Sequence, residues 1–88
     1  MKHFVYLLIT KTNKKTISYV GFTSDLKHRI KLHNSGKGAK FTRGRKWKLI
    51  YKEKIRSKKE AISREYYIKK NRTLRKKIKN ENLNSITL

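Results

Sequence analysis

The sequence contains no cysteine among its 88 residues, and only 5 of those residues are acidic. The absence of cysteine excludes disulfide bonds and thiolate metal sites, so oxygen and imidazole groups are left as the available metal ligands. A small domain without disulfides also fits a reducing cytoplasm better than secretion. The protein must therefore fold on a small apolar core without covalent cross-links.

Long apolar segments are also missing. The run from Phe4 to Ile9 is far shorter than the roughly 20 residues that span a bilayer, and nothing at the N-terminus resembles a signal peptide. We therefore expect a cytoplasmic protein that does not enter a membrane. The length suits one domain, which we expect over residues 1–80, with residues 81–88 as a frayed tail.

Positive charge dominates the composition, since 26 lysine and arginine residues give a formal net charge of +21. So large a charge on a small chain favours a polyanionic partner, and nucleic acid is the commonest polyanion in the cytoplasm. An anionic membrane surface fits less well, because the basic helices carry few large apolar side chains. Nucleases, non-catalytic binding domains and basic proteins of the ribosome or nucleoid all share this charge, which therefore does not separate them.

Two apolar segments near the N-terminus have the pattern of β-strands. Residues 3–9 are dense in β-branched and aromatic side chains, as in a strand buried on both faces, and residues 17–21 follow after a polar turn. Together they predict an antiparallel hairpin, in which Tyr6 falls opposite Tyr19 or Val20. This arrangement brings the two tyrosines close together.

A third strand and three helices complete the expected fold. In the third strand, residues 47–53, the side chains of Trp47, Leu49 and Tyr51 alternate with those on the opposite face. Helical spacing of apolar side chains predicts the helices at residues 26–33, 58–70 and 73–79. The resulting order β-β-α-β-α-α predicts an α+β domain.

Capping residues mark the predicted helix ends. Thr23-Ser24-Asp25 begins the first helix, with hydroxyls to cap it and an acid near its positive dipole end, and Gly36 ends it as a left-handed stop. Ser57 and Glu60 form a capping box that begins the second helix.

A cationic, glycine-rich loop is expected at residues 36–46, without regular structure. It holds the best candidates for gripping a nucleic-acid backbone and stacking a base: Lys37, Lys40, Phe41, Arg43 and Arg45. The alternative is a solvated, flexible loop with no binding role.

Glu65 is the acidic residue that most requires an explanation. It falls within the apolar stripe of the helix at residues 58–70, together with Ala61, Ile62 and Ile68. A carboxylate aimed at a core is costly unless a cation meets it. Either a nearby lysine or arginine pairs with Glu65, or Glu65 is a ligand for Mg²⁺ or Mn²⁺, which bind oxygen donors and often one or two carboxylates.

Four other polar side chains are candidates for chemistry. Arg29 and His33 lie one helical turn apart, where they either pack at the edge of the apolar stripe or bind a phosphate and exchange a proton. Tyr6 and Tyr19 either pack in the core or act as a general base, which requires a nearby cation to favour the phenolate. Gly21 would allow a phosphate to approach the backbone closely.

Taken together, these residues resemble the GIY-YIG nuclease superfamily, in its small single-domain branch. The chain is similar in this respect to the N-terminal nuclease domain of the repair excinuclease. Five motifs carry the resemblance, in this order: Phe4-Val5-Tyr6, Tyr19-Val20-Gly21, Arg29 with His33, Asn34 to Thr42, and Ala61 to Lys70. The sequence departs from the family pattern at Phe4, at Phe22 and at Lys77, where members often carry glycine, lysine and asparagine.

The resemblance implies a three-stranded antiparallel sheet flanked by helices, and hydrolysis of a phosphodiester with one Mg²⁺ or Mn²⁺ ion. By the same resemblance, Glu65 would hold the metal and Arg29 would bind the scissile phosphate. Tyr19 would help to deprotonate the attacking water, Tyr6 would position it or assist, and His33 matches a histidine that some members use.

We therefore expect a metal-dependent endonuclease that acts in DNA repair or processing. Its partner is expected to be nucleic acid, DNA before RNA, with no small-molecule cofactor. The alternative is a non-catalytic basic binding domain on the same fold. A carboxylate inside the apolar stripe of a helix favours the enzyme, since a binding domain has no use for it.

Overall fold

The computed structural model describes residues 2–12 and 15–81. Its elements are β1 (His3–Lys11), β2 (Thr16–Thr23), α1 (Leu26–Asn34), the short 3-10 helix η1 (Lys40–Thr42), β3 (Lys48–Ile55), α2 (Lys58–Lys70) and α3 (Arg72–Glu81). The strands form one antiparallel sheet in the order β2-β1-β3. The predicted α+β class and the order β-β-α-β-α-α are confirmed.

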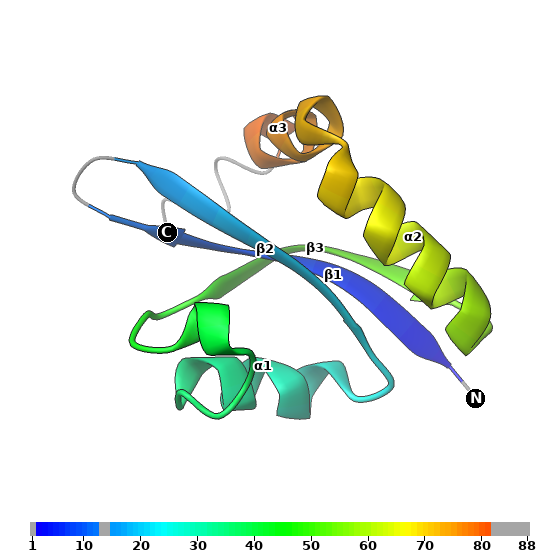
Figure 1. Cartoon of the computed structure of the whole chain (residues 1–88), viewed down its shortest axis with the longest axis horizontal. Coiled ribbons are helices and arrows are strands. Elements are labelled where there is room, and N and C mark those ends of the chain that lie inside the picture. The colour runs from blue at the N-terminus through cyan, green and yellow to red at the C-terminus, as the bar shows by residue number, and fades with distance from the viewer. Residues whose placement is uncertain (1, 13–14, 82–88) are drawn as a thin grey trace.

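The sheet separates two layers, with α1 and η1 against one face and α2 and α3 against the other (Figure 1). The central strand β1 is buried on both faces, as its sequence predicts, and each face has its own cluster of apolar side chains. The α2–α3 face contains Val5, Leu7, Ile9, Val20, Ile50, Ala61, Ile68 and Ile78. The α1 face contains Tyr6, Leu8 and Trp47, with Ile17, Tyr19, Leu26, Ile30 and Leu49 packed against them. Two thin cores, one on each side of β1, thus hold the domain together.

The register of the β1–β2 hairpin differs from the predicted one. Tyr6 lies opposite Gly21 rather than Tyr19 or Val20, and Tyr19 lies opposite Leu8. Because alternate residues share a face, Tyr6 and Tyr19 still meet on the α1 face, with ring centroids 6.4 Å apart. The predicted proximity of the two tyrosines is confirmed, although the pairing that produces it is different.

A β-bulge changes the predicted alternation in β3. Leu7 of β1 pairs with Tyr51, whereas the next residue, Leu8, pairs with Leu49, so Ile50 is an extra residue in β3. As a result, Leu49 packs on the α1 face, while Ile50 and Tyr51 both pack on the α2–α3 face. The prediction that Leu49 and Tyr51 share a face is therefore wrong.

The predicted helix ends are confirmed. The Asp25 side chain accepts a hydrogen bond from the backbone N–H of His28 at 3.1 Å, and Gly36 adopts φ +81 after α1. The Ser57 hydroxyl accepts from the backbone N–H of Glu60 at 3.2 Å. Within the described ranges, no helix is long and apolar enough to cross a membrane.

Two other expectations need correction or fall partly outside the structure. The loop at residues 36–46, expected to be irregular, contains η1, whose turn is closed by the Thr42 N–H bonded to the Ala39 carbonyl at 3.1 Å. Glu81, the first residue of the expected frayed tail, belongs to α3. Residues 82–88 lie outside the described part of the chain.

Candidate active site and nucleic-acid interface

Tyr6, His33 and Thr42 form a buried chain of hydrogen bonds that joins β1, α1 and η1. The Tyr6 hydroxyl lies 2.8 Å from His33 Nε2, and His33 Nδ1 lies 2.9 Å from Thr42 Oγ1. The Thr42 hydroxyl donates in turn to the Ala39 carbonyl at 2.8 Å. The three side chains are no more than 1% exposed, so water does not compete for these bonds.

The direction of this chain follows from its last member. Because the single hydroxyl proton of Thr42 is donated to the Ala39 carbonyl, Thr42 Oγ1 can only accept from His33 Nδ1. His33 Nδ1 therefore carries the proton, and the neutral ring presents Nε2 as an acceptor. The Tyr6 hydroxyl must then donate to His33 Nε2, and its oxygen can still accept a hydrogen bond from the side chain of Arg29.

The electrostatics of the site favour this neutral arrangement. Burial lowers the pKa of His33 from its ordinary value, and the positive charge of Arg29 lowers this pKa further. Burial raises the pKa of Tyr6 to about 12; Arg29 opposes this shift, whereas Tyr19 and Glu65 add to it. Arg29 thus acts on both Tyr6 and His33, and Tyr19 and Glu65 act on Tyr6, although these residues come from β1, β2, α1 and α2.

Two glycines make room for this chain. A Cβ atom at Gly21 would lie 2.5 Å from the Tyr6 hydroxyl oxygen and 3.1 Å from the Tyr19 ring, and one at Gly38 would lie 2.5 Å from His33 Nδ1. The two 2.5 Å distances are well inside van der Waals contact. Gly21 thus leaves room for the phenol of Tyr6 to lie over β2, and its expected role in admitting a phosphate to the backbone stays a prediction.

An aromatic cluster extends from the buried chain to the surface. The ring of Tyr19 contacts the ring of His33 edge-on at 5.0 Å between centroids, and it also stacks on Phe41 at 6.2 Å and 21°. Phe41 is 53% exposed, and the guanidinium of Arg45 lies over its ring at 5.4 Å. Trp47 supports the cluster from within the core, since its Nε1 donates to the Thr42 carbonyl at 2.9 Å. The exposed aromatic ring of the loop is therefore held in place by packing.

Glu65 lies on α2, on the opposite layer from Arg29. Its side chain is 21% exposed and lies 3.7 Å from the ammonium of Lys69, one turn further along the helix. The apolar stripe around Glu65 is narrower than expected, because Ala61 and Ile68 are buried whereas Ile62 is 47% exposed. The cation contact that was one interpretation of Glu65 is thus present, but it is long and exposed to solvent, where such pairs are weak.

The other loop candidates lie at the surface. The side chains of Lys37, Lys40 and Arg43 are largely accessible, and they share with Phe41 and Arg45 the loop that covers His33. Sequence reasoning missed Thr42 and Lys69. The spacing of Thr42 from His33 has no helical or strand period, so no pattern in the sequence marks the pair, whereas Lys69 could have been found from its i,i+4 spacing to Glu65.

The donor set fits a hard divalent cation held mainly by its substrate. Within residues 2–12 and 15–81, no three histidine or acidic side chains gather into a cage. Glu65 is a half-buried carboxylate with one weak partner, which suits Mg²⁺ or Mn²⁺ when phosphate and water supply the other ligands.

Comparison with known proteins gives one consistent match. The family model described as the GIY-YIG catalytic domain matches residues 2–80 of the chain. The UPF0213 protein CPE1444 of Clostridium perfringens is 53% identical over 66 residues, which cover 74% of this chain and 70% of the relative. The UPF0213 protein YazA of Bacillus subtilis is 46% identical over 69 residues, covering 77% and 67%.

A solved structure agrees with these matches. The solution NMR structure of the UPF0213 protein BH0048 from Bacillus halodurans is 41% identical in sequence, with a TM-score of 0.52. The similarity covers 89% of this chain and 82% of that protein. The names of these relatives state no activity.

Proposed function

This chain belongs to the GIY-YIG catalytic domain family, a family of nucleases, and on that premise we propose that it is a metal-dependent endonuclease acting on DNA. The observation that carries the proposal is the meeting of Tyr6, Tyr19 and His33 within one aromatic cluster, with Arg29 and Glu65 both acting on the Tyr6 phenol. A domain that only bound nucleic acid would have no need of a buried tyrosine–histidine pair with a fixed proton. DNA repair or processing is the cellular role that we propose for this activity.

In this proposal Arg29 binds the negatively charged phosphate, and Glu65 binds the positively charged metal ion. The planar guanidinium of Arg29 binds the scissile phosphate and stabilises the negative charge that grows on it. The carboxylate of Glu65 is the group that would hold the divalent ion. When bound, that ion lowers the pKa of water and offsets charge on the leaving oxygen.

The tyrosines handle the proton of the attacking water. Tyr19 is half-buried and lines an open pocket, so its hydroxyl can reach a water molecule beside the phosphate. Tyr6 is buried and donates to His33, so the lone pairs of its oxygen face the site and orient the neighbouring groups. Neutral His33 holds the Tyr6 proton at Nε2, so in this proposal Tyr6 positions the water and Tyr19 is the tyrosine that helps to remove its proton.

A cleavage assay with a matched pair of variants tests this function. Labelled single-stranded, duplex and branched DNA, and RNA, are incubated with Mg²⁺, Mn²⁺ or EDTA. Wild type is compared with Glu65→Gln and Tyr19→Phe, and with Glu60→Gln as the control. Glu60 is also on α2, and it has a similar i,i+4 type of ion pair, with Arg56 at 3.4 Å.

We expect metal-dependent cutting that is lost in Glu65→Gln and Tyr19→Phe, with binding retained, and unchanged in Glu60→Gln. Removal of one charge-stabilising group typically lowers the rate by about a hundredfold or more. If every substrate is bound and none is cut, the protein is the non-catalytic binding domain instead. Equal cutting by Glu65→Gln would remove Glu65 from the metal site.

A further inference from the structure

A pocket opens along the free edge of the sheet, next to the proposed active site. β2 is an edge strand in the order β2-β1-β3, and within the described residues no further strand pairs with its outer side. The pocket has a volume of about 340 Å³, and its lining residues are Ser18, Tyr19, Val20, Phe41, Lys69 and Arg75. These residues come from β2, from η1 and from the junction of α2 and α3, so the pocket joins both layers of the domain.

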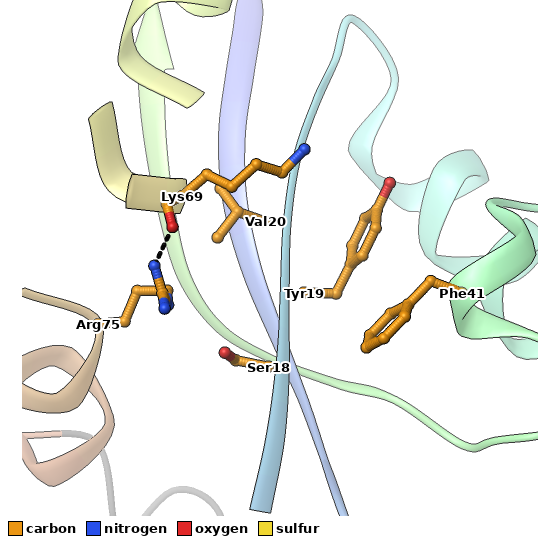
Figure 2. Close-up of a pocket in the computed structure, with 6 residues that line it drawn as sticks. All are labelled: Ser18, Tyr19, Val20, Phe41, Lys69 and Arg75. Atoms are coloured by element: carbon orange, nitrogen blue, oxygen red, sulfur yellow. Dashed lines mark hydrogen bonds between the residues drawn. The ribbon is translucent and has the colours of Figure 1, made fainter. Parts of the chain in front are cut away.

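The two walls of this pocket have different chemistry (Figure 2). Tyr19 and Phe41 lie on one side of β2, where Phe41 stacks on Tyr19 and is 53% exposed, with the Arg45 guanidinium over its ring at 5.4 Å. Lys69 and Arg75 lie on the other side, and in this view the Lys69 side chain extends across β2 towards Tyr19. One wall can therefore stack a planar ring and the other can hold a negative charge.

Arg75 is fixed in its wall by backbone groups. Its guanidinium donates to the Ile68 carbonyl at 2.9 Å and to the Lys69 carbonyl, so it caps the end of α2. Among the described residues, no carboxylate forms an ion pair with Arg75, and Lys69 has only its long contact with Glu65. The positive charge of this wall is thus largely available to a ligand.

The base of the pocket is the strand edge itself. An edge strand presents backbone N–H and C=O groups that no neighbouring strand satisfies, and here they lie beside the Ser18 hydroxyl. Such groups can bond to the polar edge of a heterocycle whose flat face is stacked on Phe41. A nucleotide offers a flat ring with a polar edge, which is its base, and a phosphate.

We propose that this pocket binds one unpaired nucleotide of the substrate strand, with its base stacked on Phe41 and its phosphate at Lys69 and Arg75. The inference rests on the proposed nuclease function, because the contact of Lys69 with Glu65 places this nucleotide next to the scissile phosphate. A base inside a duplex already has both faces stacked and its edge paired, so it cannot enter. The preferred substrate therefore has an unpaired nucleotide beside the cut.

The charge of the chain argues against another occupant of the strand edge. A second copy could in principle pair along β2, but each copy carries +21 and the pocket is itself lined by cations. Self-association along β2 is nevertheless an outcome that the experiment detects.

The chain offers a matched control for Phe41. Tyr67 on α2 is also 53% exposed, and the guanidinium of Arg64 lies over its ring at 5.2 Å, much as Arg45 lies over Phe41 at 5.4 Å. Tyr67 does not line the pocket at β2. The two residues thus share exposure and a cationic neighbour, and they differ in their relation to the strand edge.

The test measures binding in EDTA, so that no substrate is cut. Full-length protein is titrated into a short single-stranded DNA carrying one 2-aminopurine, and into the same sequence as a duplex, at fixed salt. Variants are Phe41→Ala, Phe41→Leu, Phe41→Trp and Tyr67→Ala. Phe41→Leu keeps apolar bulk over the aromatic cluster, so it reports on stacking even if Phe41→Ala perturbs the loop.

We expect wild type to quench the fluorescence of 2-aminopurine, and Phe41→Ala and Phe41→Leu to weaken single-strand binding about fivefold or more while duplex binding stays the same. Phe41→Trp should retain the preference, and Tyr67→Ala should change neither affinity. Equal losses on single strand and duplex, an equal effect of Tyr67→Ala, or sedimentation showing dimers that Phe41→Ala disrupts would each overturn the pocket. If the protein cuts DNA but shows no preference for single strands, the nucleotide pocket is refuted and the nuclease function stands. If it prefers single strands but cuts nothing, the nuclease function is refuted and the pocket stands.

Discussion

The substitution Thr42→Val tests whether a hydroxyl in the loop fixes the proton of His33. Valine has nearly the shape of threonine, so the packing of this buried position is largely kept. What is lost is the acceptor 2.9 Å from His33 Nδ1, together with the hydroxyl that donates to the Ala39 carbonyl at 2.8 Å. Either the Nδ1–H then remains buried without a partner, or the ring adopts the other tautomer and presents an N–H to the Tyr6 hydroxyl.

Both outcomes carry a cost that can be calculated in order of magnitude. A buried donor left without a partner destabilises a protein by about 1–3 kcal/mol. In a domain of this size, each kcal/mol lowers Tm by about 4–8 °C. In the second outcome the energetic cost is smaller, but Tyr6 can no longer donate to His33, so the proton chain is reversed and cleavage falls.

The assay combines calorimetry with NMR of the imidazole nitrogens. In wild type, we expect the His33 ring to be neutral with its proton on Nδ1; in Thr42→Val, we expect a lower Tm or a proton on Nε2. Thr42→Ser keeps the hydroxyl and should behave like wild type in both measurements. A wild-type ring with its proton on Nε2, or a Thr42→Val variant with unchanged Tm and tautomer, would refute the reasoning.

Three further changes test other parts of the site. Gly21→Ala places a methyl group 2.5 Å from the Tyr6 hydroxyl oxygen, so we expect a loss of about 1–3 kcal/mol by denaturant unfolding together with loss of cleavage, and unchanged stability would contradict the contact. The pKa of His33 is lowered in the folded state, so near and below the unfolded value of about 6.5 the unfolded chain binds more protons than the folded one. The free energy of unfolding should therefore be full above that pH and decline below it, and the decline should be less steep in His33→Gln. Neutralising Lys40 and Arg43 should weaken binding to all sequences alike and reduce the salt slope by about 0.9 per lost phosphate contact in duplex titrations, whereas an unchanged slope would show that the loop does not touch the backbone.

The fold could be predicted from the sequence because its signals are local. The apolar run of β1, the capping side chain of Ser57 and the glycine after α1 each act within a few residues, and each is where it was expected. The β-bulge at Ile50 could not be predicted, since a period of two residues carries no information about where a strand inserts an extra one. The hairpin register was missed for a similar reason. Tyr6 lies opposite Gly21, where the absence of a side chain leaves room for the phenol, and this contact between two strands leaves no pattern within either one.

The sequence names candidate site residues but does not show how they are connected. The resemblance to a family supplied Tyr6, Tyr19, Arg29, His33 and Glu65, and the fold brings these side chains into one electrostatic neighbourhood. The partner of His33 on its second nitrogen depends on how the loop closes over α1. That closure requires a glycine against the imidazole, and its outcome is set by three-dimensional packing.

The separation of Arg29 and Glu65 on opposite layers has a chemical consequence for the proposed reaction. Two such side chains on one helix or on facing helices would form an ion pair and neutralise each other. Here α1 and α2 lie on opposite faces of the sheet, and within the described residues the only ion pair of Glu65 is the weak one with Lys69 (Figure 1). In the proposed reaction, each group therefore remains available, the guanidinium for a phosphate and the carboxylate for a cation. A phosphodiester bound at the edge of the sheet could contact the guanidinium from one layer and the metal-binding carboxylate from the other. In the proposed function, the edge of the sheet is therefore where the substrate binds.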